Sequence, residues 1–219
     1  MAMKQIYVSR TFTTRQQRQR AVSLLPYIAV LVGLHYLRSA WTAMIFYQAG
    51  MAATLLHQHF DWRVLWRGWH GRDGLLLSVL TGSSGILLVL CQDIWLTDRA
   101  SFQHLLQQVG LMSDHLPLFI LCFSILTPVL EEAFWRGALG STSTQLAHSD
   151  LLFAGYHILV LAAFTSVPIA VVSGSGLAIM AWLWRRQYMR HQGLAVPVAS
   201  HFGADLSIML AVQYLWLYT

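Results

Sequence analysis

Three short polar motifs interrupt otherwise apolar stretches in the later part of the chain. They are Glu131-Glu132-Ala133-Phe134-Trp135-Arg136, Phe153-Ala154-Gly155-Tyr156-His157 and His201-Phe202-Gly203-Ala204-Asp205. Ionisable side chains at membrane depth are costly, and those that occur there usually serve a function. Carboxylates, histidines and an arginine spread over three apolar helices therefore indicate a catalytic site that moves protons.

The first motif offers a candidate general base. Glu132 and Arg136 are four residues apart, in the order that favours an ion pair on one helix face. Glu131 is rotated by about 100° from that face and has no partner on its own helix. We therefore expect Glu131 to accept a proton from water, while Glu132 and Arg136 support the site.

The second and third motifs each place a histidine one helical turn from another candidate residue. Phe153 precedes His157 by four positions, and His201 precedes Asp205 by four. An imidazole can share in water activation or donate to a developing charge. We expect His157 to act with Glu131 and Phe153 to support it. Asp205 could orient His201 or could carry a proton itself.

The same residue types could also bind zinc, so a metal site is an alternative. The spacing lacks the compact His-Glu-x-x-His arrangement of helical metalloprotease sites. We therefore expect no metal and no other cofactor.

Composition indicates where these motifs lie. Only 11% of the 219 residues are charged and 56% are hydrophobic, whereas soluble domains carry about 25% charged residues. The chain is predicted to be an all-α, polytopic transmembrane helix bundle with about seven spans (six to eight), and segments 93–115 and 133–150 could each hide a further short membrane-embedded helix. The expected spans are 21–37, 39–56, 75–92, 116–133, 151–168, 173–188 and 194–217.

Charge distribution predicts the orientation of these spans. With a cytoplasmic N-terminus, 12 of the 14 Lys and Arg residues fall on the inner side, as the positive-inside rule requires. Residues 1–20 are expected to form a basic cytoplasmic arm that is solvated or binds lipid headgroups, and does not bind nucleic acid. The first apolar stretch is expected to be an uncleaved anchor, and 21–219 a single transmembrane domain in the cell membrane. All three motifs then lie toward the cytoplasmic side.

Two further segments have a recognisable pattern. In the 57–74 loop, Trp62, Trp66 and Trp69 recur at helical spacing beside arginines, which predicts a helix lying in the inner membrane interface. It would serve as an anchor or as a surface that receives substrate. The small residues of 81–85 indicate close helix packing, with a hinge or gate as the alternative.

The motifs Glu-Glu-x-x-x-Arg, Phe-x-x-x-His and His-x-x-x-Asn or Asp occur in this order on late membrane helices. This arrangement resembles the CAAX protease and bacteriocin-processing family, also called CPBP or Abi, over about residues 127–210. The resemblance implies a glutamic-type intramembrane endopeptidase in which Glu131 and His157 activate water. His201 and Asp205 would match the family's oxyanion-stabilising pair.

One residue departs from the best-studied members of the family. They have Asn where this chain has Asp205, and an ionised carboxylate repels an oxyanion whereas an amide donates to it. Asp205 must therefore be protonated or must serve His201 instead.

The resemblance leaves the substrate open. Candidates are a prenylated protein, a bacteriocin or pheromone precursor, or a membrane protein with a C-terminal sorting tail, and a prokaryotic setting favours the last two. The leading alternative function is a non-catalytic scaffold, regulator or bacteriocin-immunity protein of the same fold. A proton-coupled transporter is a second alternative, although the sequence shows no repeat of the kind many transporters have.

Overall fold

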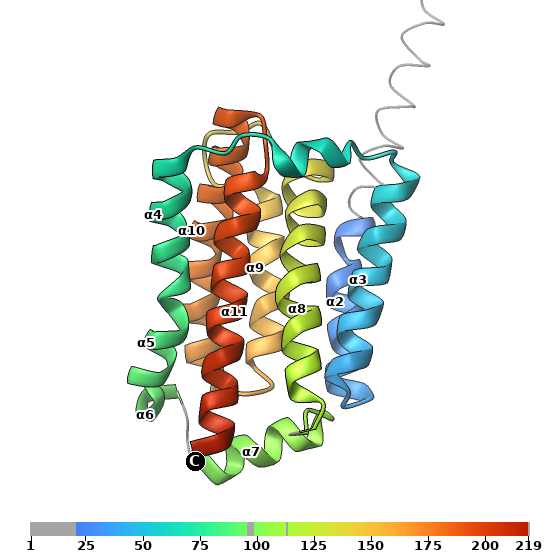
Figure 1. The fold of residues 1–219 in the computed structure, drawn as a ribbon. Helices are drawn as coiled ribbons and strands as arrows, with labels where there is room; N and C mark the ends of the chain where they lie inside the picture. Colours follow the sequence, from blue (N-terminus) through green and yellow to red (C-terminus); the bar gives the residue numbers. More distant parts are fainter. Residues whose placement is uncertain (1–20, 96–98, 113, 219) are drawn as a thin grey trace, which may run out of the picture.

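The computed structural model describes residues 21–95, 99–112 and 114–218, and every regular element in these ranges is a helix. Figure 1 shows the long helices standing side by side as one bundle. The prediction of an all-α fold is confirmed. The basic arm of residues 1–20 lies outside the described residues, so its role stays a prediction.

Of the helices that correspond to the first three predicted spans, the first and the third change geometry or break along their length. The first continues from an α-helix into a π-helix, the second is one uninterrupted helix, and the third is divided at Ser83. The elements are α2 (Leu25–Val30), η1 (Leu31–Tyr36), α3 (Ala40–His57), α4 (Gly71–Gly82) and α5 (Ser84–Leu90).

The last four predicted spans correspond to four helices. These are α8 (Leu116–Glu131) with its continuation η3 (Glu132–Ala138), α9 (His148–Leu161), α10 (Val167–His191) and α11 (Ala195–Tyr218). All of these except α10 carry one of the three motifs. The boundary predicted at 168 is wrong, because α9 ends earlier and α10 already begins at Val167. Pro168 explains the difference, since proline is favoured in the first turn of a helix.

The two segments suspected of hiding a short membrane helix differ from each other. Segment 93–115 holds α6 (Gln92–Trp95) and α7 (Arg99–Gln108), which are too short to span a bilayer. Figure 1 shows α7 lying across one end of the bundle. Segment 133–150 continues α8 as η3 and then becomes a loop. The buried Arg185 ties this loop to the start of α9, since it binds the carbonyl oxygens of Ser143 and Gln145 in the loop and Asp150 Oδ2 in α9, at 2.7 Å.

The tryptophan-rich segment is not the regular helix that its spacing predicts. Only Trp62–Trp66 is helical, as the short 3₁₀-helix η2, and the chain then runs extended toward α4. The extended part contacts the start of α11, where the backbone N–H of Ala195 donates to the carbonyl of Arg67 at 3.1 Å. A neighbouring N–H–carbonyl bond joins Leu194 to Val64 at 2.9 Å. These bonds give the segment a tertiary partner that its helical periodicity did not reveal.

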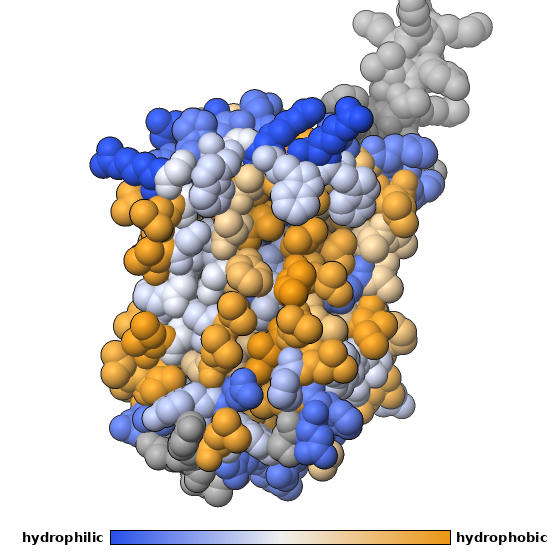
Figure 2. Space-filling model, in the orientation of Figure 1, coloured by the Kyte–Doolittle hydropathy of each residue, from blue (hydrophilic) through white to orange (hydrophobic). Residues whose placement is uncertain are grey.

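The exterior is that of a membrane protein. Within the described residues, four helices are long and apolar enough to cross a bilayer. Figure 2 shows apolar side chains forming a band between two polar ends of the molecule. The total of seven spans and the cytoplasmic N-terminus stay predictions. The four helices are Gly71–Leu90, Leu116–Ala138, Val167–His191 and Ala195–Leu217.

Small residues bring α4 and α5 close to α11. Thr81 Oγ1 donates to the carbonyl of Ser200 at 2.6 Å, so the two backbones approach each other closely. A Cβ atom added to Gly85 would lie 2.0 Å from the carbonyl oxygen of Ser207. These contacts support the interpretation that residues 81–85 serve close helix packing. They hold α4 and α5 against α11, the helix that carries the third motif.

Replacing Gly85 by alanine should therefore weaken the bundle. The new methyl group would push α5 away from α11 and cost about 1–3 kcal/mol. Gly176 lies in α10 with nothing within 4 Å of an added Cβ, so Gly176→Ala should be neutral or stabilise by up to about 1 kcal/mol. Thermal unfolding in detergent micelles compares the two variants. Equal midpoints would contradict the tight contact at Gly85.

Candidate active site

A distorted helix end positions the two glutamates of the first motif. Pro128 supplies no backbone N–H inside α8, and directly after Glu131 the helix widens into the π-helix η3. Such π-turns occur frequently at functional sites. The side chains of Glu131 and Glu132 are 1% and 0% exposed. Each buried carboxylate needs a partner inside the protein.

Glu132 has two such partners. Its Oε1 lies 3.2 Å from Nη1 of Arg136 and 2.9 Å from Nδ1 of His201. The predicted ion pair between Glu132 and Arg136 is thereby confirmed. The Arg136 guanidinium also lies over the ring of Phe153, at 4.2 Å, and near that of Trp184, at 5.1 Å. Cation–π contacts of this kind hold the arginine in a fixed plane.

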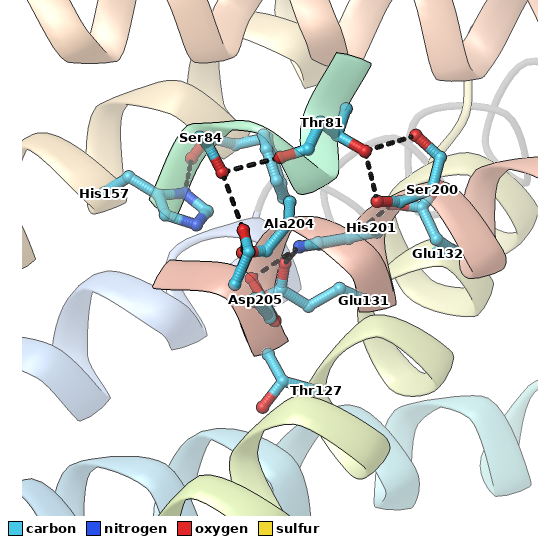
Figure 3. A network of polar contacts seen from close by, with 12 residues as sticks. Thr81, Ser84, Thr127, Glu131, Glu132, His157, Ser200, His201, Ala204 and Asp205 are labelled. Carbon is cyan, nitrogen blue, oxygen red and sulfur yellow. Dashed lines mark hydrogen bonds and ion pairs between the residues drawn. The ribbon is translucent and has the colours of Figure 1, made fainter. Parts of the chain in front are cut away.

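His201 presents its other nitrogen to two carboxyl groups. Its Nε2 lies 3.5 Å from Asp205 Oδ1 and 3.7 Å from Glu131 Oε2. Figure 3 shows His201 and Asp205 facing Glu131 and Glu132. Glu132 binds Nδ1 and so helps to orient the ring. Asp205 shares Nε2 with Glu131, and its expected role, as a group that orients His201 or as a proton carrier, stays a prediction.

Glu131 and His157 are connected through a tyrosine. The Tyr156 hydroxyl donates to Glu131 Oε1 and lies 3.1 Å from His157 Nε2. His157 Nδ1 donates to the carbonyl of Phe153 at 2.8 Å. Sequence reasoning missed Tyr156, although it stands directly before His157 in the second motif.

Three carboxyl oxygens at the site have no hydrogen-bond partner among the described residues. They are Glu131 Oε2, Glu132 Oε2 and Asp205 Oδ2. Buried polar atoms are rarely left unpaired, and the oxygens of Glu131 and Asp205 belong to groups that face His201 Nε2. These two oxygens are available to accept a hydrogen bond from water or from a bound peptide.

Neighbouring helices hold the His201 ring in place. Trp184 on α10 stacks on it with ring centroids 4.5 Å apart and planes 17° from parallel. The indole N–H of Trp184 donates to Ser200 Oγ at 3.0 Å, and Ser200 is the residue that Thr81 of α4 binds (Figure 3). No motif in the sequence singled out Trp184.

The structure brings all seven predicted residues of the site together in one cluster, in which His157 and Asp205 are half-buried and the other five are buried. Three different helices and one π-turn contribute them, which the sequence predicted from the common depth of the motifs. They are Glu131, Glu132, Arg136, Phe153, His157, His201 and Asp205. In the described part of the chain, no group of three or more His, Cys, Asp or Glu side chains is arranged to hold a metal ion.

Comparison with protein families supports the resemblance carried by these motifs. Residues 113–207 match the model of the type II CAAX prenyl endopeptidase Rce1-like family. The match includes all three motifs, spans less than half of the chain and confirms the predicted resemblance to the CPBP proteases. Comparisons with curated proteins and with solved structures gave no match.

Removing Arg136 should destabilise the protein far more than removing a surface arginine. Arg136→Met leaves Glu132 buried with only His201, at a cost of about 3–5 kcal/mol. The double variant Arg136→Met/Glu132→Gln should cost less than the sum of the single changes, because the two groups interact directly. Chemical unfolding in micelles measures all three variants.

The matched control is the exposed pair of Arg67 and Asp61, whose charged atoms are 3.9 Å apart. Arg67→Met should cost less than about 1 kcal/mol. If Arg136→Met is no worse than Arg67→Met, the buried ion pair does not stabilise the site.

Proposed function

We propose that this chain, with its Rce1-like segment at 113–207, is a glutamic-type intramembrane endopeptidase. It hydrolyses a peptide bond of a membrane-associated protein or peptide. The observation that carries the proposal is that the buried Glu131 carboxylate has one hydrogen-bonded oxygen and one oxygen without a partner. Its Oε1 is held by Tyr156, and its unpartnered Oε2 lies 3.7 Å from His201 Nε2.

The first step is attack by water. A water molecule bound to Glu131 Oε2 gives that oxygen a proton as its own oxygen bonds to the carbonyl carbon. The π-electron pair of the carbonyl group moves onto its oxygen and forms a tetrahedral oxyanion. The electron pair of the oxyanion then re-forms the carbonyl as the C–N bond breaks, and the leaving nitrogen takes up the proton that Glu131 received from water. We expect His157 to act together with Glu131 in moving these protons.

The second element is stabilisation of the oxyanion. Glu132 accepts the Nδ1–H of His201, so the ring is held with Nε2 facing the place where charge develops. An N–H at this nitrogen would donate to the oxyanion. Asp205 lies 3.5 Å from the same nitrogen. Its carboxyl group adds a donor when it is protonated and repels the oxyanion when it is ionised.

The depth of the site supports a membrane-associated substrate. Glu131 precedes the end of η3 at Ala138 by seven positions, which corresponds to roughly 10 Å along the helix. A scissile bond must therefore reach into the apolar band. We infer a sorting tail, a bacteriocin or pheromone precursor, or a CAAX-type protein as substrate. The arginine-rich loops adjoin the same end of the bundle, which supports a cytoplasmic-facing site in a cell membrane.

Glu131→Gln should abolish proteolysis and leave the fold intact. The amide keeps the size of the side chain but cannot take the proton from water, so we expect a loss of about 10²–10⁴-fold. Mass spectrometry of new peptide termini, in membranes that carry the wild type or the variant, tests this and identifies substrate and cleavage site together.

Asp61→Asn is the matched control, because it also neutralises one carboxylate but at an exposed position. It should generate the same termini as the wild type. Termini that persist unchanged in Glu131→Gln at equal expression would refute the protease proposal and make a scaffold or immunity role the leading account.

Asp205→Asn should retain cleavage to within about tenfold, because an amide N–H can donate to the oxyanion. Asp205→Leu removes the donor and should lower the rate by about 10²–10³-fold. Initial rates on a peptide that spans the mapped cleavage site compare the two variants. If Asn is as damaging as Leu, Asp205 acts as an ionisable partner of His201 and not as a donor.

A further inference from the structure

The hydroxyl group of Tyr156 lies between the two residues expected to activate water. It donates to Glu131 Oε1 and is 3.1 Å from His157 Nε2. A phenol has one proton and therefore can donate fully to only one of two acceptors at a time. Which acceptor it serves depends on whether each of them carries a proton.

The orientation of His157 makes its Nε2 the second acceptor. The carbonyl of Phe153, 2.8 Å from Nδ1, can only accept a hydrogen bond, so Nδ1 carries the proton. In the neutral ring, Nε2 then has a lone pair directed at the phenol. A buried acceptor without a donor is unfavourable, so this nitrogen competes with the Glu131 carboxylate for the phenol proton.

The ring of Tyr156 is fixed, so only its O–H bond needs to move. The residue is 3% exposed. Its ring stacks parallel to Trp135, with centroids 6.2 Å apart, and packs edge-on against Phe153 at 5.9 Å. On another side it meets Tyr47 at 5.2 Å. A hydroxyl held in this way can change its acceptor without moving the side chain.

We infer that Tyr156 is a positioning residue that couples Glu131 to His157. This inference rests on the proposed function. Before attack, the phenol donates to the carboxylate through Oε1, which leaves Oε2 to receive the proton of water. Once Glu131 is neutral it accepts more weakly, and the phenol O–H turns to His157 Nε2. This rotation of the O–H bond gives His157 Nε2 a hydrogen-bond donor in the same step in which Glu131 becomes protonated. No covalent bond of Tyr156 is broken.

The test uses the purified full-length protein in liposomes and a fluorescence-quenched peptide that spans the mapped cleavage site. Tyr156→Phe should lower kcat by about 10–100-fold and leave KM within about twofold. Tyr27→Phe is the control, because it also removes a phenol hydrogen bond, the one to the Leu152 carbonyl at 2.8 Å. It should stay within about threefold of the wild type.

A purely structural role would not produce two further results. When His157 is already replaced by alanine, Tyr156→Phe should lower log kcat by less than half as much as it does in the wild-type protein, because the second acceptor is already gone. Fluorinated tyrosines at position 156 keep the shape of the ring and change the acidity of the phenol, so kcat should vary steadily along the series. They also provide the test if Tyr156→Phe does not fold.

Three outcomes would overturn the coupling. These are full activity of Tyr156→Phe, equal effects with and without His157, and equal rates for all fluorinated variants. If Glu131→Gln is inactive while Tyr156→Phe is fully active, the coupling fails and the proposed function stands. If wild type and Glu131→Gln do not differ, both fail.

Discussion

The site depends on one carboxylate, that of Glu132, and on the two groups that bind it. Placing an ion in an apolar interior costs several kcal/mol unless partners surround it. Arg136 at 3.2 Å supplies the opposite charge, and His201 at 2.9 Å supplies a hydrogen-bond donor. Because His201 lies on α11 and Glu132 on η3, this single carboxylate joins the helices that carry two of the three motifs. Because Glu132 takes the arginine and His201 Nδ1, the oxygens of Glu131 face other groups, namely the Tyr156 hydroxyl and His201 Nε2.

A second constraint is the position of α11, since both His201 and Asp205 lie on it. At its start, the backbone N–H groups of Leu194 and Ala195 bond to the carbonyls of Val64 in η2 and of Arg67 just after it. One turn before Asp205, the stacked Trp184 holds His201. Farther along, Gly85 lets α5 approach the backbone at Ser207. Contacts at three levels therefore fix the helix, which can present His201 Nε2 to Glu131 without relying on the ligand to order it.

The sequence predicted what depends on local spacing and on the bilayer, and it missed what depends on tertiary contact. The ion pair of Glu132 with Arg136 follows from a separation of four residues, and the common depth of the motifs follows from where apolar stretches begin. The π-turn at Glu132 was not predicted, because hydropathy does not distinguish it from an α-helix. Trp184 and Tyr156 look like ordinary membrane aromatics until the helices are assembled. The Trp62–Trp69 spacing was misleading because backbone bonds to α11 hold that segment.

Charge balance connects the stability of this cluster with its chemistry. Three carboxyl groups, those of Glu131, Glu132 and Asp205, lie around His201, and one of them, that of Glu132, also pairs with the guanidinium of Arg136. A neutral cluster must therefore hold two protons among its carboxyl and imidazole groups. Such protons have several sites within a few ångströms. In the proposed reaction, a proton that moves from water to Glu131 would therefore change the distribution of charge without burying a new ion. Asp205, where better-studied relatives have an amide, then adds one more proton site to the cluster. The same condition that lets these residues stay buried in the membrane makes them suited to exchange protons with a substrate.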